Sequence, residues 1–410
     1  MIYKNKKIIF KNLLSKNIIA FFLKKNYILK YIKYIIIIFI YLYLFYSIYY
    51  LKIISDPSCK EISQYIKDNL AGKLFNNKSE FYKRDYPLIS IVISTFNGEV
   101  YLKPAVRSIQ NQNFIDLEII IVNDGSMDNT LKVVKELMEE DHRIKLISNS
   151  KNRGTLYTKT KGVLNTNGKY VMTLDHDNLY STNYVFSKLY HESEKFNLDL
   201  LGFSTISTPV EVTKTKYKSS LNYFKTPIIR KPKIKRRFTG FIKKIESGTY
   251  LCLYFIKQQL FLNIIKQLGR EFLFRNIDAH DDTILMFLLS RNALTLKHVK
   301  AIFYIVFEWP ESYKKALEFQ LNTKKKERER KNCYSYLTFI EVVFRFTENN
   351  YEKYIADRCF QMWFLEKEEC KKQTDTKNYA IKLCNLFLNN EYISPETKSK
   401  ISIYLNQTKN

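Results

Sequence analysis

The chain has 410 residues, of which 46% are hydrophobic, so it can bury a core in two domains or in one large domain with appendages. Its formal net charge of +27 is compatible with nucleic acid, anionic lipid head groups or phosphorylated molecules as partners. We do not expect nucleic acid, because no motif that combines aromatic and basic residues is recognisable. The six cysteines show no C-x-x-C spacing, which excludes a zinc site of that kind.

The N-terminal segment is basic and then strongly apolar. Residues 1–33 carry nine lysines and no acidic residue, and residues 34–51 have no charged side chain. As a helix, the apolar segment would span about 27 Å, close to the hydrocarbon thickness of a bilayer. We therefore expect a basic cytosolic tail (1–33), one transmembrane signal-anchor helix (34–51) and a stalk (52–86). Lysine-rich flanks stay in the cytosol, which predicts a single-pass type II membrane protein with its C-terminal bulk in a lumen.

Strand-like and helix-like segments alternate from residue 88 onward. The strand-like runs are nearly all apolar and fall at 88–95, 117–124, 144–149, 169–175 and 198–205. Helix-like stretches lie between them at 99–112, 128–140, 155–165 and 182–196. Apolar strands that alternate with helices are typical of a mostly parallel sheet with helices on both faces. The predicted fold class is α/β.

The second half of the chain is less regular. Residues 211–238 form a basic stretch with two prolines and are predicted to be a loop. A helix is predicted to begin near Asp281 and Asp282, since acidic side chains complement the dipole at a helix N-terminus. Residues 311–410 are rich in Lys and Glu and predict amphipathic helices, for example at 336–346 and 379–387.

Polar residues follow three of the predicted strands at the points where these strands end. Thr95 ends the first strand, Asp124 ends the second, and Asp175 ends the fourth, with Asp177 two residues later. The carboxyl ends of parallel strands share one edge of a sheet, and ligands bind there. Two carboxylates one residue apart can share a divalent cation such as Mg²⁺ or Mn²⁺, which would suit a diphosphate leaving group. The sequence therefore predicts a phosphate-handling site at this edge.

Further residues fit the same site. Asp124 can accept hydrogen bonds from a nucleobase or a ribose, and the helix N-termini after Gly125 and Gly154 favour phosphate. Lys159 would add positive charge. A general base would have to reach the site from elsewhere in the chain, and Asp281 or Asp282 fits that role.

Four segments together resemble the successive signatures of family 2 glycosyltransferases of the GT-A fold. They read ISIVISTFNG, LEIIIVNDGSMDNT, NRGTLYTKTKGVLNTNGKYVMTLDHDN and HDDTILMFL. The resemblance is strong over residues 88–200, thinner to about residue 306 and absent beyond. It implies a GT-A glycosyltransferase domain at 87–310, followed by a helical C-terminal extension at 311–410.

The resemblance also implies an activity, namely inverting transfer of a sugar from a nucleotide-diphosphate sugar to a hydroxyl of a glycan, protein or lipid. Asp282 would be the catalytic base, with Asp281 beside it. Asp177 and Asp175 would hold Mg²⁺ or Mn²⁺. The nucleotide sugar would be bound by Thr95, Phe96, Asn97, Asp124, Gly125, Ser126, Lys159 and Asp175. Lys159 and Thr160 depart from the Arg-Asn pair of many members. The sequence has no Q-x-x-R-W motif, so we do not expect a processive synthase.

Two alternatives stay open. The chain could be a non-catalytic GT-A-like protein that binds glycans or acts as a scaffold through residues 311–410, although the carboxylates of Asp124, Asp175, Asp177 and Asp282 favour an enzyme. The second alternative concerns the membrane orientation.

The predicted orientation places the enzyme in a lumen, where it needs imported nucleotide sugar, and this predicts the Golgi or the endoplasmic reticulum. With the opposite orientation, the domain would face the cytosol and could glycosylate a polyprenyl phosphate.

Overall fold

The structure, a computed structural model, describes residues 86–209, 227–231, 250–308, 325–346, 374–391 and 393–409, together with Asp357 and Phe360. The predicted tail and transmembrane helix, nearly all of the stalk and most of the basic loop at 211–238 lie outside these residues. Among the described residues, none of the helices is both long and apolar enough to cross a membrane.

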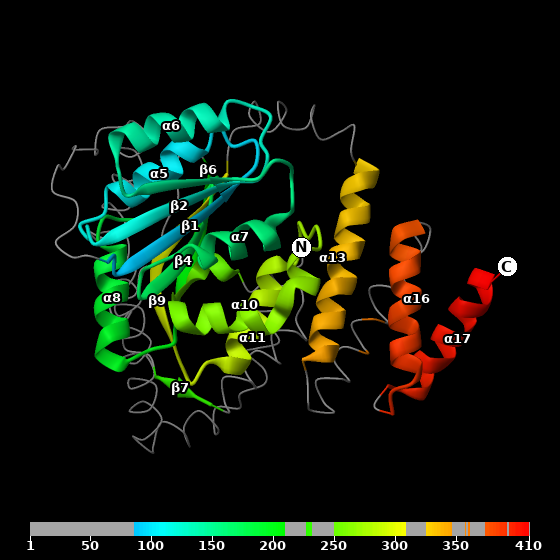
Figure 1. The fold of residues 1–410 in the computed structure, drawn as a ribbon. Coiled ribbons are helices and arrows are strands. Elements are labelled where there is room, and N and C mark those ends of the chain that lie inside the picture. Colours follow the sequence, from blue (N-terminus) through cyan, green and yellow to red (C-terminus); the bar gives the residue numbers. More distant parts are fainter. Residues whose placement is uncertain are drawn as a thin grey trace, which may run out of the picture. The chain divides into compact units, whose positions relative to one another are not determined.

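One mixed sheet organises the described part of the chain (Figure 1). Its first half is parallel, in the order β3-β2-β1-β4, with β1 at Ile89–Thr95, β2 at Leu117–Asn123, β3 at Ile144–Ser148 and β4 at Tyr170–Asp175. The second half contains β8 (Tyr254–Lys257), β6 (Leu200–Pro209), β9 (Thr295–Glu308), β5 (Leu179–Tyr180) and β7 (Ile229–Arg230). There β6 and β9 are parallel, whereas β8, β5 and β7 pair antiparallel with their neighbours. The α/β prediction is confirmed. The long strand β9 and the short antiparallel strands are additions that the sequence pattern does not predict.

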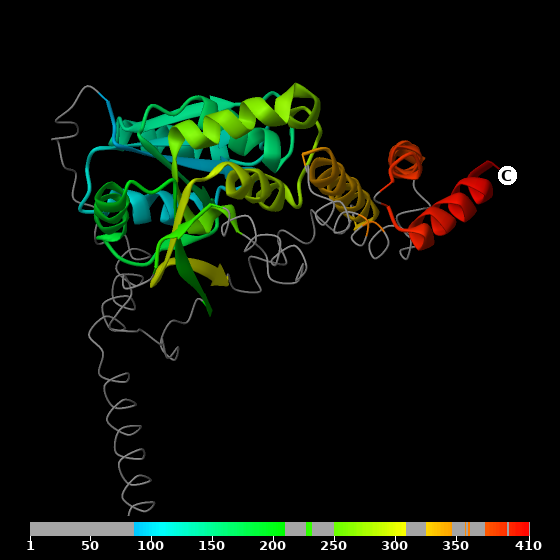
Figure 2. The same cartoon turned by 90° about the horizontal axis from the view of Figure 1, so that it is seen from below.

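Helices cover both faces of this sheet (Figures 1 and 2). One face packs against α5 (Leu102–Gln110), α6 (Thr130–Glu140) and α8 (Val185–Phe196). The other face packs against α7 (Thr155–Leu164), α10 (Gln258–Leu273) and α11 (Asp281–Asn292). The division follows strand alternation, since Ile91 and Ile93 face the first layer and Val92 faces the second. Gly162 lets α7 approach the sheet closely, because a Cβ there would lie 2.3 Å from Val92 Cγ1.

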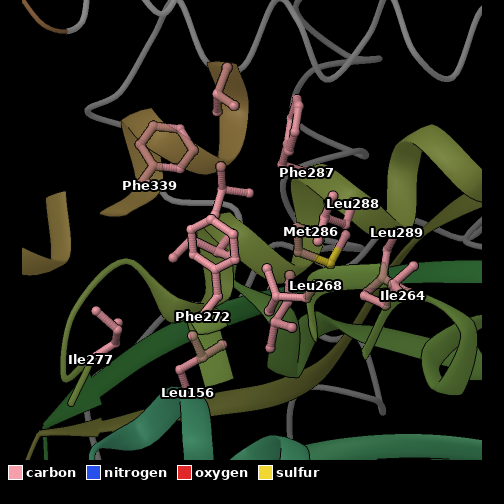
Figure 3. Close-up of a cluster of buried hydrophobic side chains, with 14 of the residues drawn as sticks. Leu156, Ile264, Leu268, Phe272, Ile277, Met286, Phe287, Leu288, Leu289 and Phe339 are labelled. Atoms are coloured by element: carbon pink, nitrogen blue, oxygen red, sulfur yellow. The ribbon is translucent and has the colours of Figure 1, made fainter. Parts of the chain in front are cut away.

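Three helices follow the sheet, namely α13 (Lys325–Arg345), α16 (Thr374–Leu388) and α17 (Pro395–Lys409). α13 contains the predicted amphipathic stretch 336–346 except for its last residue, and α16 contains the stretch at 379–387. Each packs on its predecessor, and α13 packs against α11. Figure 3 shows Phe339 of α13 in the same buried cluster as Phe272 of α10 and Phe287 of α11. The C-terminal helices and the α10/α11 layer therefore share one hydrophobic core.

Candidate active site

The ends of β1, β2 and β4 lie side by side, as the sequence predicts. Thr95 is the register partner of Asn123, and Ser94 is the register partner of Asp175. The amide of Asp124 donates to the carbonyl of Thr95 at 2.8 Å. Residues from three separate strand ends are thus brought to one edge of the sheet.

The turns after β1 and β2 are tied to each other. Asn97 has φ 51, and its backbone N–H donates to Ser126 Oγ at 2.9 Å. The side-chain oxygen of Asn97 accepts from the amide of Met127 at 3.0 Å. Gly125, with φ 74, supplies the left-handed turn that brings these groups together. The ring of Phe96 stays 37% exposed beside them, so it can form a wall of a ligand site.

Asp124 is buried and organises the segment between β3 and α7. Its Oδ1 accepts hydrogen bonds from Asn149 Nδ2 at 2.8 Å and from the amide of Arg153 at 2.9 Å, and its Oδ2 accepts from the amide of Gly154 at 3.0 Å. Gly154 has φ 86 and directly precedes α7. Asp124 therefore fixes the start of α7, while its predicted contact with a nucleotide stays a prediction.

Lys159 joins the two groups of predicted acidic residues. It lies on α7, is 5% exposed, and its Nζ is 2.6 Å from Asp282 Oδ1 and 2.9 Å from Asp281 Oδ2. The same Nζ lies 3.6 Å from Asp175 Oδ1. The structure thus brings Asp175 at the end of β4 together with the first turn of α11, around one ammonium group. The predicted contact of Lys159 with donor phosphate stays a prediction, and its ammonium is paired with carboxylates in this structure.

The charges of this cluster shift each other's protonation. Burial by itself lowers the pKa of Lys159, but the carboxylates of Asp281, Asp282 and Asp175 outweigh it, so its pKa lies well above the usual value. Burial raises the pKa of Asp282 to about 7, against the opposing pull of the Lys159 ammonium. One cation is therefore shared among three carboxylates, and Asp282 titrates near neutral pH.

Asp282 is held from two sides. Its Oδ1 accepts a hydrogen bond from Lys159, and its Oδ2 accepts from the amide of Leu251 at 3.1 Å. Leu251 begins a short 3₁₀ helix, η2 (Leu251–Leu253), directly before β8. Two donors from different elements fix the plane of this carboxylate, as a proton acceptor of defined direction requires.

Tyr304 is a further site residue, which sequence reasoning missed. Its hydroxyl donates to Asp175 Oδ2 at 3.3 Å and accepts from the amide of Asp175 at 3.3 Å. Burial raises the pKa of Tyr304 well above its ordinary value, so the phenol keeps its proton. In the sequence Tyr304 is one aromatic residue within an apolar strand, and no local signal places it opposite Asp175.

Asp177 and Asp175 are suitable ligands for a hard cation. Burial raises the pKa of Asp177, the neighbouring His176 lowers it, and the Asp175 carboxylate raises it again. A bound divalent cation would relieve this repulsion between carboxylates. The described residues contain no group of three His, Cys, Asp or Glu side chains that could hold a metal by themselves. Two carboxylates therefore fit Mg²⁺ or Mn²⁺ only with phosphate oxygens and water as the remaining ligands, a common arrangement for Mg²⁺.

Residues 90–253 match the family model described as glycosyl transferase family 2. This part of the chain is therefore similar to the family 2 glycosyltransferases. The matched segment runs from β1 to η2 and includes Asp124, Lys159, Asp175 and Asp177, whereas α11 with Asp282 lies beyond it.

Individual relatives agree with this family. A GalNAc(5)-diNAcBac-PP-undecaprenol beta-1,3-glucosyltransferase from Campylobacter jejuni is 42% identical over 92 residues, which cover 22% of this chain and 30% of that protein. An uncharacterized glycosyltransferase from Haemophilus influenzae is 37% identical over 99 residues, covering 24% and 31%. The chain thus spans only about a third of the length of these relatives.

The fold is also similar to that of a solved structure. The crystal structure of S. aureus TarS residues 1–349 in complex with UDP-GlcNAc aligns with a TM-score of 0.51 and 12% sequence identity. The alignment covers 76% of this chain and 83% of that one. At this identity the similarity concerns the fold alone. It covers a larger part of the chain than residues 90–253, which the family model matches.

Replacing Lys159 with Met should destabilise the protein strongly. Lys159 is the only cation that contacts Asp175, Asp281 and Asp282 among the described residues. Removing it leaves the buried carboxylate of Asp281 and the partly buried one of Asp282 uncompensated, and breaking a buried ion pair typically costs about 3–5 kcal/mol. Urea unfolding at pH 7 measures this loss. Lys161→Met is the matched control, because Lys161 lies on the same helix and donates to Asn149 Oδ1 instead. Equal losses in the two variants would contradict a special role of Lys159.

Proposed function

We propose that the protein catalyses an inverting, metal-dependent transfer of a sugar from a nucleotide-diphosphate sugar to a hydroxyl of a glycan, protein or lipid. The observation that carries this proposal is the meeting of Asp175 and Asp282 around Lys159, at the sheet edge of a family 2 domain. One carboxylate is suited to the diphosphate side of the reaction. The other is suited to accept a proton on the acceptor side.

In this proposal Asp282 takes the proton of the acceptor hydroxyl. The oxygen then attacks the anomeric carbon on the face opposite the departing nucleoside diphosphate, which inverts the configuration. Asp177 and Asp175 would hold Mg²⁺ or Mn²⁺, which when bound would neutralise charge on the leaving diphosphate. Tyr304 orients Asp175, and the amide of Leu251 orients Asp282. Asp281 shares the Lys159 ammonium and keeps that cation close to the base.

The nucleotide half of the donor is assigned to the linked turns after β1 and β2. The exposed ring of Phe96 and the polar groups of Asn97 and Ser126 offer stacking and hydrogen bonding beside the strand ends. The solved complex of TarS with UDP-GlcNAc supports a nucleotide sugar as the ligand class on this fold.

A panel of nucleotide sugars tests the proposal. The protein should release nucleoside diphosphate from one member of the panel in the presence of Mn²⁺, slowly with water and faster with the correct acceptor. The same donor should raise the melting temperature, since a ligand that binds only the folded state stabilises it. Absence of turnover with every donor, despite binding, would favour the non-catalytic glycan-binding or scaffold alternative.

The activity should fall at acidic pH. Because the pKa of Asp282 is raised to about 7 and a general base must be deprotonated, kcat/KM should drop roughly tenfold per pH unit below this value. Donor turnover measured from pH 5 to pH 9 would show this acidic limb. A profile that stays flat down to pH 5 would contradict the assignment of Asp282 as the base.

We further propose that the domain is lumenal, in the Golgi or the endoplasmic reticulum, behind a single transmembrane anchor at 34–51. The lysines of 1–33 support this orientation. Cys333 is disulfide-bonded, whereas Cys252 and Cys384 are free thiols, and structural disulfides are typical of oxidising compartments. A C-terminal tag on the full chain should be protected from protease in sealed membranes. Digestion of the tag before detergent is added would show that the C-terminal domain faces the cytosol, which is the opposite orientation.

A further inference from the structure

The helices after β9 lie beyond the segment that the family model matches, and no step proposed so far uses them. We infer that α13 positions the catalytic base, by packing against the turn that precedes α11. This inference rests on the proposed function, since it assigns a role in the same reaction. It gives the C-terminal helices a part in catalysis.

The first observation is the environment of α11. Its middle is apolar on every side, and every one of its residues from Ile284 to Leu289 is buried. A helix that is apolar all round must be covered all round. α10 packs against it, and α13 packs against it as well. In both views α13 lies next to the α10/α11 layer, and Figure 3 shows Phe339 in the cluster with Phe287 and Leu288 (Figures 1, 2 and 3).

The second observation is the residue that sets the start of α11. His280 directly precedes Asp281 and has φ 59, a left-handed conformation that is uncommon outside glycine. Its carbonyl accepts from the amide of Ile284 at 3.0 Å and so begins the helix. The ring of His280 meets the ring of Tyr336 edge to face, with centroids 4.9 Å apart. An unfavourable backbone conformation persists only where the surroundings hold it, and Tyr336 is one such contact.

The third observation is that α13 is itself fixed to the segment that leads into His280. Glu341 of α13 is buried and accepts from Arg275 Nη1 at 2.8 Å. Arg275 lies between α10 and α11, and its Nη2 also pairs with Glu271 at 3.1 Å. Tyr379 of α16 donates to the same carboxylate. A buried ion pair and an aromatic contact therefore hold both ends of this short connection against α13.

Three variants test this inference in the full chain. Tyr336→Ala should lower kcat for donor turnover on the order of 10- to 100-fold, because a base displaced by about 1 Å loses that much, while donor KM stays within about twofold. Tyr336→Phe should restore kcat, since the ring contact does not need the hydroxyl. His280→Asn should reproduce the loss, because Asn tolerates the left-handed conformation but lacks the ring.

The double variant of Tyr336→Ala and His280→Asn should lose no more kcat than either single variant, since the two residues act through one contact. Tyr334→Ala is the matched control, because its ring packs on Tyr379 of α16 at 5.0 Å rather than on His280. Fully additive losses, or an equal loss of kcat in Tyr334→Ala, would overturn the positioning role. A wild-type kcat in His280→Asn would also overturn the positioning role, but it would leave the proposed function standing. Absence of turnover in the wild type would instead overturn the proposed function.

Discussion

Replacing Asp282 with Asn is expected to lower kcat for sugar transfer by about 10²–10⁴-fold, the usual contribution of a positioned general base. The amide keeps the shape of the carboxylate and can still accept from Leu251, but it cannot take a proton. Binding of nucleoside diphosphate should persist, because the nucleotide is assigned to the turns after β1 and β2. Single-turnover kinetics with saturating donor would measure the loss, and a nucleotide titration would measure binding.

Asp278→Asn is the matched control for this variant. Asp278 precedes α11 in the same loop as His280 but is not one of the carboxylates around Lys159. We expect its kcat to stay within about twofold of wild type, because the substitution leaves all three carboxylates around Lys159 in place. Full activity in Asp282→Asn would exclude this residue as the base. In that case Asp281, which shares the Lys159 ammonium, would be the next residue to replace.

Replacing Asp177 with Ala is expected to remove the dependence on Mn²⁺ together with most of the activity. A cation held by only two protein carboxylates and the donor diphosphate loses half of its protein ligands in this variant. We expect a fall in kcat/KM of at least about 100-fold, since charge on the leaving diphosphate is no longer neutralised. The melting-temperature increase caused by Mn²⁺ with nucleoside diphosphate should disappear in parallel.

Binding of Mn²⁺ can be measured without enzymatic turnover. Titration of Mn²⁺ followed by electron paramagnetic resonance would report binding directly, and EDTA should reproduce the defect in the wild type. Glu139→Gln, which removes an exposed carboxylate on α6, is the control and should bind Mn²⁺ as the wild type does. Mn²⁺ affinity that is unaltered in Asp177→Ala would remove this residue from the metal site.

Much of the first half of the fold could be predicted from the sequence. The strands β1, β2 and β4 agree with the predicted runs to within one residue at either end, because unbroken apolar runs followed by Gly or Asp turns are a local signal. The start of α5 was predicted three residues early, since the turn after Asn97 continues to Tyr101. The sequence pattern does not predict α10, the long strand β9 or the short antiparallel strands β5, β7 and β8. Short strands carry little pattern of their own, because their partners stabilise them.

The sequence by itself determined the class of fold, the family resemblance and the acidic residues at the strand ends, because all three are encoded in short contiguous segments. Only the tertiary structure decided which groups these acids meet. Lys159 reaches Asp282 across 123 positions of sequence, and Tyr304 reaches Asp175 across 129. Contacts of that range depend on strand order and register, which local hydrophobic periodicity does not specify. For the same reason only the folded chain reveals that a helix far beyond the family segment packs on the turn before the proposed base.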